Sequence, residues 1–242
     1  MKEKISISVE KELLKQVDNF VDGRNVRNRS QAVERILAEH FGSRGISKAI
    51  VLMGRSKNIS KTGLKSTLDM MKSAGVSEII MAGGENNDMI FKHLGTGKES
   101  GVRIEYLKEK DLRGTAGCVN LAKDSFDSRF IVVAGDTSFT FDLKKMIASH
   151  MEKRSIATIG VTAVKLEDST DSLILEGDRI VHFNYKDEKP TYMTNAGVYI
   201  FETEIFEYIP AKGSLERDVF PKLAKEGKLN AYVFYRQWKH NE

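Results

Sequence analysis

This 242-residue chain contains a single cysteine, Cys118, and that scarcity excludes two kinds of stabilisation. One thiol forms no intramolecular disulfide and builds no cysteine-rich zinc site, which needs several thiolates. The chain has no run of about eighteen apolar residues, so it predicts no membrane span. Its amino terminus is charged and lacks the apolar core of a signal peptide, so we expect a cytoplasmic protein.

Excess charge of one sign is also small. The formal net charge is +4, which by itself does not indicate a nucleic-acid partner. The distribution is more informative, because Arg24, Arg27 and Arg29 lie within one short segment. A solvated charged loop would show the same clustering.

The first forty-two residues combine a strand pattern with two helix patterns. Ile5, Ile7 and Val9 alternate with polar residues, which is the period of a strand. Apolar residues at helical spacing over 13–21, and again from about residue 30 to 41, predict two amphipathic helices.

Asn28 and Gln31 fit the capping box that begins a helix. One strand and two helices leave two unpaired strand edges and two uncovered apolar stripes. Two copies related by a two-fold axis would cover both, so we expect a homodimer through this segment.

The order strand, helix, basic loop and helix, with Asn28-Arg-Ser-Gln-Ala-Val33 opening the second helix, resembles the ribbon-helix-helix family of DNA-binding domains. The resemblance implies a small dimeric β-α-α head at residues 1–44 that lays a two-stranded ribbon in the major groove of double-stranded DNA. The alternative is a dimerisation module without DNA binding. The DNA-contacting residues that the resemblance implies, with the basic loop added, are Lys4, Ser6, Ser8, Arg27, Arg29 and Ser30.

Beyond a short linker at 43–47, the pattern changes to that of an α/β domain at 47–242. A continuous apolar run predicts a buried strand over 48–53, and further strands are expected over 78–81, 102–107 and 130–134, with helices between them. This alternation is typical of a mostly parallel sheet covered by helices. After residue 155 the pattern becomes β-rich, with strands over 156–164, 172–175, 179–184, 197–201 and 229–235, and one helix over 215–224.

Six stretches of this second part carry a family resemblance. They are residues 48–52, 72–80, 112–117, 130–136, 195–201 and 215–223. In sequence and order they look like sugar-phosphate nucleotidyltransferases such as mannose-1-phosphate guanylyltransferases. The resemblance implies a Rossmann-like (GT-A-like) fold with a mixed sheet, and a nucleotide or sugar site formed by Gly114, Thr115, Ala116, Gly117, Asp136, Asn195 and Gly197.

The sequence departs from that family at the phosphate and metal positions. The loop at 53–63 is short and lacks paired glycines and proline, although Arg55, Lys57 and Lys61 are present. Asp136 matches a family residue that carries Mg²⁺, but Lys239 stands near the place of the second carboxylate. The family lysine that contacts the sugar phosphate could correspond to Lys186 or Lys189.

We interpret these departures as a catalytically degenerate transferase domain. The leading hypothesis is a transcription regulator whose body senses a nucleotide or nucleotide sugar, or serves as an oligomerisation surface. The alternative is an active nucleotidyltransferase that is dimerised by its head and uses Mg²⁺ through Asp136. A third possibility is a DNA-organising protein whose body is only a packing block. Separately, the chain has two parts that could each dimerise, joined by a short linker, and this arrangement would allow tetramers.

Overall fold

The computed structural model describes two compact units, Met1–Gly45 and Ile46–Glu242, which we call the head and the body. Each is described by itself. The residues that the structure describes are 5–21, 23, 26–41, 45–53, 61–82, 87–109, 111–135, 137–139, 141–166, 171–185, 191–235 and 238–240.

The described residues of the head form two helices, α1 (Lys11–Asn19) and α2 (Arg29–Phe41). The capping box is confirmed: Asn28 Oδ1 accepts a hydrogen bond of 2.9 Å from the Gln31 backbone N–H. Gln31 Oε1 reaches back to the backbone N–H of Arg27 at 2.7 Å, one residue earlier than the usual pattern. These bonds satisfy backbone donors around the start of α2.

The strand predicted over 4–9 does not form within the described part of a single chain. Residues 5–10 have no regular secondary structure, and Ile5 and Ile7 are 66% and 59% exposed. A strand needs a hydrogen-bonded neighbour, and alternation in the sequence does not supply one.

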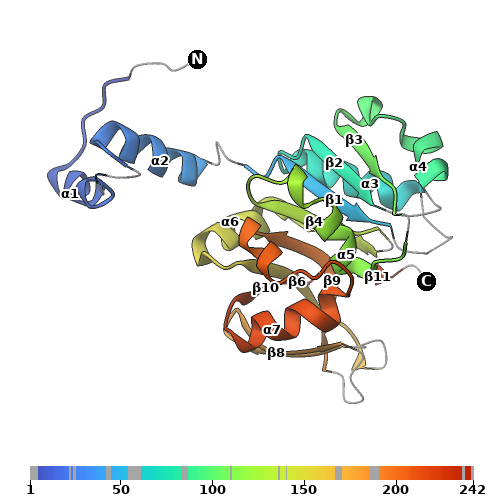
Figure 1. The fold of residues 1–242 in the computed structure, drawn as a ribbon. Helices are drawn as coiled ribbons and strands as arrows, with labels where there is room; N and C mark the ends of the chain where they lie inside the picture. Colours follow the sequence, from blue (N-terminus) through green and yellow to red (C-terminus); the bar gives the residue numbers. More distant parts are fainter. Residues whose placement is uncertain are drawn as a thin grey trace. The chain divides into compact units, whose positions relative to one another are not determined.

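The body is built on a nine-stranded mixed sheet with the order β3-β2-β1-β4-β9-β6-β10-β8-β7 (Figure 1). The four strands from β3 to β4 run parallel to one another, and β9 pairs antiparallel with both β4 and β6. The strands of this sheet are β1 (Lys48–Leu52), β2 (Glu78–Ala82), β3 (Arg103–Leu107), β4 (Phe130–Ala134), β6 (Ala157–Ala163), β7 (Asp171–Glu176), β8 (Arg179–Tyr185), β9 (Met193–Phe201) and β10 (Leu229–Phe234).

Two short strands outside the large sheet were not anticipated from the sequence. β5 (Thr137–Phe139) and β11 (Trp238–His240) form a separate antiparallel pair. Each has three residues, too few for a periodic pattern, and the partners lie far apart in the chain.

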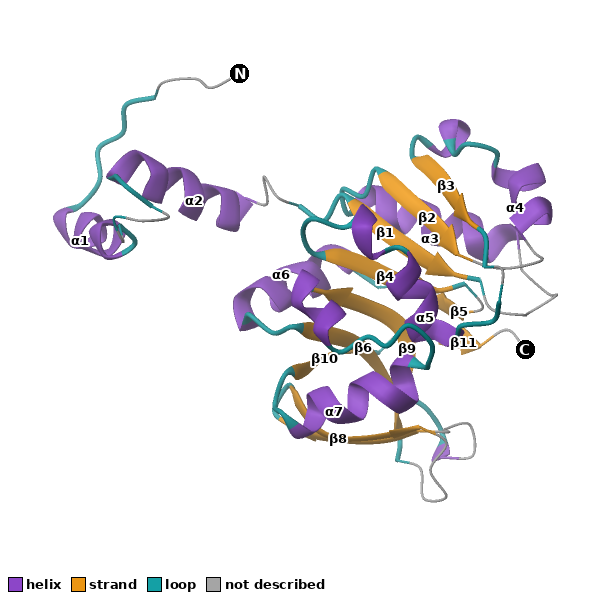
Figure 2. Ribbon diagram, viewed as in Figure 1, coloured by secondary structure: helices purple, strands orange, loops and turns teal. Residues whose placement is uncertain are grey.

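Helices cover both faces of the large sheet (Figure 2). The regular helices of the body are α3 (Lys61–Ser73), α4 (Asn87–Leu94), α5 (Gly114–Leu121), α6 (Leu143–Lys153) and α7 (Phe220–Lys225). Single turns are η1 (Lys98–Ser100), η2 (Lys123–Ser125), η4 (Thr203–Glu207) and η5 (Leu215–Val219), the last of which is a π-helix.

The core forms two layers because each central strand buries both of its faces. In β1, Ile50 and Leu52 pack with residues of α5 and α7, while Ala49 and Val51 pack with residues of α3 and α6. This two-sided burial explains the continuous apolar run from which the sequence predicts β1. The α/β class with a mixed sheet is therefore confirmed for the body. No helix in the described ranges is long and apolar enough to cross a membrane.

Candidate active site

The candidate site lies where the parallel strands end. β1 and β4 pair in parallel up to Leu52 and Ala134, and β9 pairs with β4 as far as Val133 opposite Val198. Because β9 runs the other way, its earlier residues, including Asn195, lie beside the carboxyl end of β4. In open α/β sheets the crevice beyond the carboxyl ends of the strands is the usual ligand site.

A bulge in β9 shapes this edge. Between β6 and β9 the register shifts, so that Ile159 faces Tyr199 but Val161 faces Asn195. Gly197 has φ +74°, a left-handed conformation that side chains other than glycine rarely adopt. The Asn195 Oδ1 atom accepts a 3.0 Å hydrogen bond from the Gly197 N–H, which fixes the orientation of the Asn195 amide.

The start of α5 is held by a neighbouring loop. Gly114 has φ +75°, and a Cβ atom there would collide with the carbonyl oxygen of Gly213. That same oxygen accepts a 3.0 Å hydrogen bond from the Ala116 N–H, and the Gly213 N–H donates to the Arg113 carbonyl at 2.8 Å. Only glycine permits this close approach at Gly114.

One carboxylate connects α5 to β9. Glu216 Oε2 accepts hydrogen bonds from the Thr115 hydroxyl at 2.8 Å and from the Ser214 hydroxyl at 2.6 Å. Glu216 Oε1 accepts from the Tyr199 hydroxyl at 3.3 Å, and Tyr199 in turn accepts from Asn195 Nδ2 at 2.9 Å. We call these five residues the Glu216 cluster.

The structure thus brings together Thr115 and Asn195, two of the residues that the sequence predicts for the site. Ala116 and Gly117 are buried within α5, and Gly114 is exposed. Asp136 lies outside the described residues, as do the phosphate-loop positions 54–60 and both lysine candidates, Lys186 and Lys189.

Sequence reasoning missed Glu216 and Tyr199. The stretch 215–223 indicates the fold by resemblance, but nothing in it marks Glu216 as a partner of Thr115, which is 101 residues away in the chain. The π-helical turn that carries Glu216 is a signal visible only in the structure, and such turns are frequent at functional sites.

The described residues contain no group of three side chains able to hold a metal ion. The Mg²⁺ that the family resemblance implies would depend on Asp136, which is not among them. The described part alone therefore does not form a magnesium site, and we derive no chemical step through the metal.

Cys118 lies on α5 in the same region but is not available for chemistry. Burial of the thiol, with Glu109 as a further cause, raises its pKa strongly. A thiol held in the protonated form is a poor nucleophile and metal ligand. Cys118 is therefore a core residue, as its 7% exposure also indicates.

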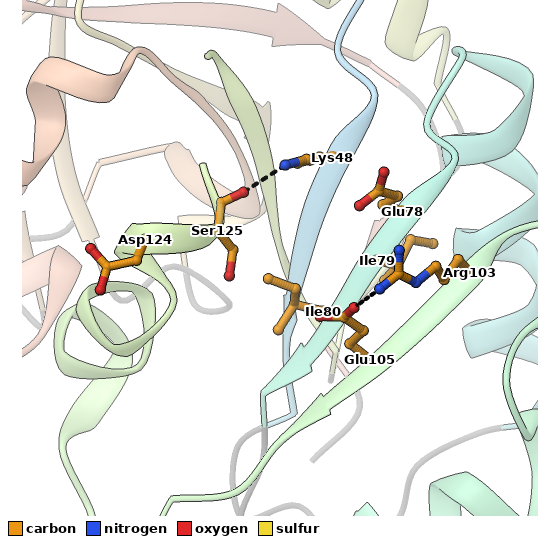
Figure 3. Close-up of a pocket in the computed structure, with 8 residues that line it drawn as sticks. All are labelled: Lys48, Glu78, Ile79, Ile80, Arg103, Glu105, Asp124 and Ser125. Carbon is orange, nitrogen blue, oxygen red and sulfur yellow. Dashed lines mark hydrogen bonds and ion pairs between the residues drawn. The ribbon is translucent and has the colours of Figure 1, made fainter. Parts of the chain in front are cut away.

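A separate pocket lies at the opposite end of the strands (Figure 3). It has a volume of about 230 Å³ and is lined by the first residues of three parallel strands, Lys48, Glu78 and Arg103. Lys48 donates a 2.8 Å hydrogen bond to the Ser125 carbonyl, and Arg103 is paired with Glu105. The two cationic side chains that line the pocket, Lys48 and Arg103, therefore already have partners. The pocket is separate from the crevice at the carboxyl ends of the strands.

The residues predicted to contact DNA do not form a site in the described head. Lys4 lies outside the described residues, and Ser6 and Ser8 lie on the irregular segment 5–10. The Arg29 guanidinium is bound to Asp18: Nε donates to Oδ1 at 2.6 Å and Nη2 donates to Oδ2 at 2.8 Å. Arg27 and Ser30 are exposed.

The fold and the polar crevice together define a class: an α/β protein with a candidate ligand site at the carboxyl ends of its central strands. Comparison with known proteins identifies the family. The model of the nucleotidyl transferase family matches residues 43–239, so the chain belongs to that family.

Named relatives agree with this assignment. Mannose-1-phosphate guanylyltransferase of Mycobacterium tuberculosis is 30% identical over 183 residues, which cover 73% of this chain and 51% of that protein. D-glycero-alpha-D-manno-heptose 1-phosphate guanylyltransferase of Aneurinibacillus thermoaerophilus is 26% identical over 166 residues, covering 67% of this chain and 72% of that protein. This chain therefore spans about half the length of the first relative and nearly three quarters of the second.

A solved structure shows the same fold. HddC of Yersinia pseudotuberculosis, complexed with GMP-PN, superposes with a TM-score of 0.66 at 25% identity, covering 81% of this chain and 93% of that one. The nucleotidyltransferase resemblance of the body is therefore confirmed.

These comparisons correct three predictions. A transcription regulator as the function, a degenerate body without enzymatic activity, and DNA binding are wrong, because the named relatives are sugar-phosphate nucleotidyltransferases and their names do not indicate DNA binding. The altered positions in the loop at 53–63 and near Lys239 are few beside the match to the family, which spans residues 43–239.

Proposed function

We propose that this protein is a sugar-phosphate nucleotidyltransferase. In the reaction, a phosphate oxygen of a sugar 1-phosphate attacks the α-phosphorus of a nucleoside triphosphate. A new phosphorus–oxygen bond forms while the bond from the α-phosphorus to the bridging oxygen of the β-phosphate breaks. The products are a nucleoside diphosphate sugar and pyrophosphate.

The observation that carries this proposal is the match to the nucleotidyl transferase family across nearly the whole body. The arrangement of the crevice supports it, because Asn195 and the bulge at Gly197 lie beside the carboxyl end of β4, where ligands usually bind in open α/β sheets. The relatives named above act on sugar 1-phosphates by name, which makes a sugar 1-phosphate the first acceptor to test.

Within this proposal the crevice at α5 and β9 binds the nucleotide or the sugar. Mg²⁺, when bound, would neutralise the charge of the phosphates, and Asp136 is the residue we propose to hold it. The protein's own described residues orient the substrates: Thr115 and Asn195 are held in one hydrogen-bonded cluster. A cytoplasmic location remains a prediction from the sequence.

The test is pyrophosphate release by the full chain with Mg²⁺. GTP, UTP and dTTP are each supplied with mannose 1-phosphate and with glucose 1-phosphate. We expect turnover with at least one pair and a loss of at least about a hundredfold in Asp136→Ala, since the charge stabilisation that a bound metal ion supplies to the transition state is worth several kcal/mol. Asp124→Ala, an exposed carboxylate at the opposite end of the strands, is the matched control and should keep full activity. No turnover with any pair would refute the proposal.

We also propose that the head is a ribbon-helix-helix-like module that dimerises the enzyme. Its apolar side chains support this, because Ile5, Ile7 and Leu13 are each more than half exposed. Phe20 and Leu37 are exposed as well, at 39% and 38%. A second copy would pair with residues 5–10 and cover these side chains, each contributing roughly 1.5–3 kcal/mol when fully buried.

Light scattering of the full chain tests the dimer. Ile7→Asp should convert it to monomers at micromolar concentration, because a buried unpaired charge at the interface is costly. Ser6→Asp and Ser8→Asp, on the alternate side of the same segment, are the controls and should leave the dimer intact. A monomeric wild-type protein would refute the proposal, and larger assemblies, including tetramers, would appear in the same measurement.

A further inference from the structure

The Glu216 cluster has a hydrogen-bonding order that can be read from its fixed donors. The Leu215 backbone N–H donates to the Thr115 hydroxyl at 2.8 Å, so the Thr115 proton must point elsewhere, toward Glu216 Oε2 at 2.8 Å. On the other side, the Gly197 N–H fixes Asn195 Oδ1 as an acceptor. Asn195 therefore directs its NH₂ group at the Tyr199 oxygen, which lies 2.9 Å away.

This order requires both oxygens of Glu216 to accept. With its oxygen accepting from Asn195, the Tyr199 hydroxyl directs its proton at Glu216 Oε1, 3.3 Å away. A carboxylate has two acceptor oxygens, whereas a glutamine has one acceptor and one NH₂ donor. A glutamine at this position would therefore place its NH₂ group against a hydroxyl that is already directed to donate.

Tight packing keeps this cluster in one arrangement. Tyr199 is 2% exposed and Ser214 is 8% exposed, and the Ser214 hydroxyl also accepts from the Arg217 N–H as the cap of η5. Ser214 N–H donates to Asp218 Oδ2 at 2.7 Å, which holds the same turn from the other side. Hydrogen bonds in such partly buried networks strengthen one another.

We propose that Glu216 is a positioning residue that sets the separation between the first turn of α5 and the bulge of β9, so that a substrate spanning the two is held in one geometry. This inference deepens the proposed function and rests on it. Glu216 acts through Thr115 and Tyr199, and not by touching the reacting atoms.

The kinetic test compares Glu216→Gln and Tyr199→Phe with a matched pair elsewhere in the body. Tyr208 donates a 2.7 Å hydrogen bond to Glu226, so Tyr208→Phe and Glu226→Gln remove the same kind of contact away from the crevice. We expect Glu216→Gln to raise KM for one of the two substrates about tenfold or more, and Tyr199→Phe to raise the same KM. The control variants should leave both KM values within about twofold.

A double-mutant cycle adds a readout that a purely structural role would not move. If Glu216 acts through Tyr199, the effects of the two substitutions on that KM should be strongly non-additive, because the second substitution removes a contact already lost. Unchanged KM values in Glu216→Gln, with only a lower melting temperature, would overturn the proposal, as would fully additive effects.

Amide hydrogen exchange separates this proposal from the proposed function, since it needs no turnover. The Ala116 and Gly197 amides lie at the two ends of the cluster. Glu216→Gln should accelerate exchange at both by about fivefold or more under conditions where the wild-type protein stays folded. Unaltered exchange at both amides would overturn the positioning role even if the enzyme proved active, and accelerated exchange would support it even if no substrate pair turned over.

Discussion

Replacing Gly114 with alanine tests the architecture of the crevice at its tightest point. Two penalties combine in this variant. The left-handed φ of +75° costs a residue with a side chain roughly 1–2 kcal/mol. The new methyl group would also collide with the Gly213 carbonyl, whose carbon lies 3.0 Å from the ideal Cβ position, so the backbone must move.

That movement has a further cost, because the Gly213 oxygen accepts the hydrogen bond from Ala116 N–H. Losing or weakening this bond costs about 1 kcal/mol. We therefore expect Gly114→Ala to lower the free energy of unfolding of the body by about 2–4 kcal/mol. For a domain of this size that corresponds to a decrease in melting temperature of roughly 4–16 °C.

Gly177→Ala is the matched control, because Gly177 has a φ of +63° but nothing within 4 Å of its ideal Cβ position. It should carry the conformational penalty alone, about 1–2 kcal/mol. Urea unfolding of both variants, followed by fluorescence of the full chain, gives the difference. If Gly114→Ala were no more destabilising than Gly177→Ala, the close approach of the 213 loop to α5 would be refuted.

Three further predictions concern the core and the head. Burial raises the pKa of the Glu202 carboxyl, but its contacts with His150 and Arg129 outweigh burial, so the pKa is lowered overall. The ionised carboxylate therefore stabilises the folded protein above the unfolded-state pKa of about 4.3, and this stabilisation is lost as the pH falls through the lower folded-state pKa. Glu202→Gln should cost about 1–3 kcal/mol at pH 7 and progressively less in acid, and a pH-independent difference in urea unfolding would contradict this. Because burial raises the pKa of Cys118, its thiol should be unreactive toward Ellman's reagent at pH 8 until the body unfolds, whereas immediate reaction of the folded protein would show the burial to be wrong. Asn28→Ala should destabilise the head by about 1 kcal/mol through loss of the α2 cap, and equal stability in thermal unfolding would argue against that cap.

Much of the body could be predicted from the sequence because burial leaves a local signature. The strands β1 and β4 are apolar on both faces, and the helix α3 repeats Leu64, Leu68 and Met71 at helical spacing. For the strand β9 the sequence pattern predicts only residues 197–201. In the structure Gly197 instead forms a bulge within a strand that begins at Met193.

The candidate site could be predicted only in part, because its central carboxylate depends on contacts distant in the chain. Thr115 and Asn195 were identified by family resemblance, but Glu216 acquires its role from hydroxyl groups contributed by α5 and β9. In the head, alternation predicts a strand that the described residues 5–10 do not form, because a strand exists only when a partner supplies hydrogen bonds.

Transfer of a labelled phosphate tests the central claim most directly. The wild-type chain is incubated with Mg²⁺, a sugar 1-phosphate and a nucleoside triphosphate that carries the label at either its α- or its γ-phosphate. Our account predicts that the α-label appears in a nucleoside diphosphate sugar and the γ-label appears in pyrophosphate. If neither product forms with any substrate pair, or if the γ-label is released as inorganic phosphate while the sugar 1-phosphate stays unchanged, the assignment as a sugar-phosphate nucleotidyltransferase is contradicted.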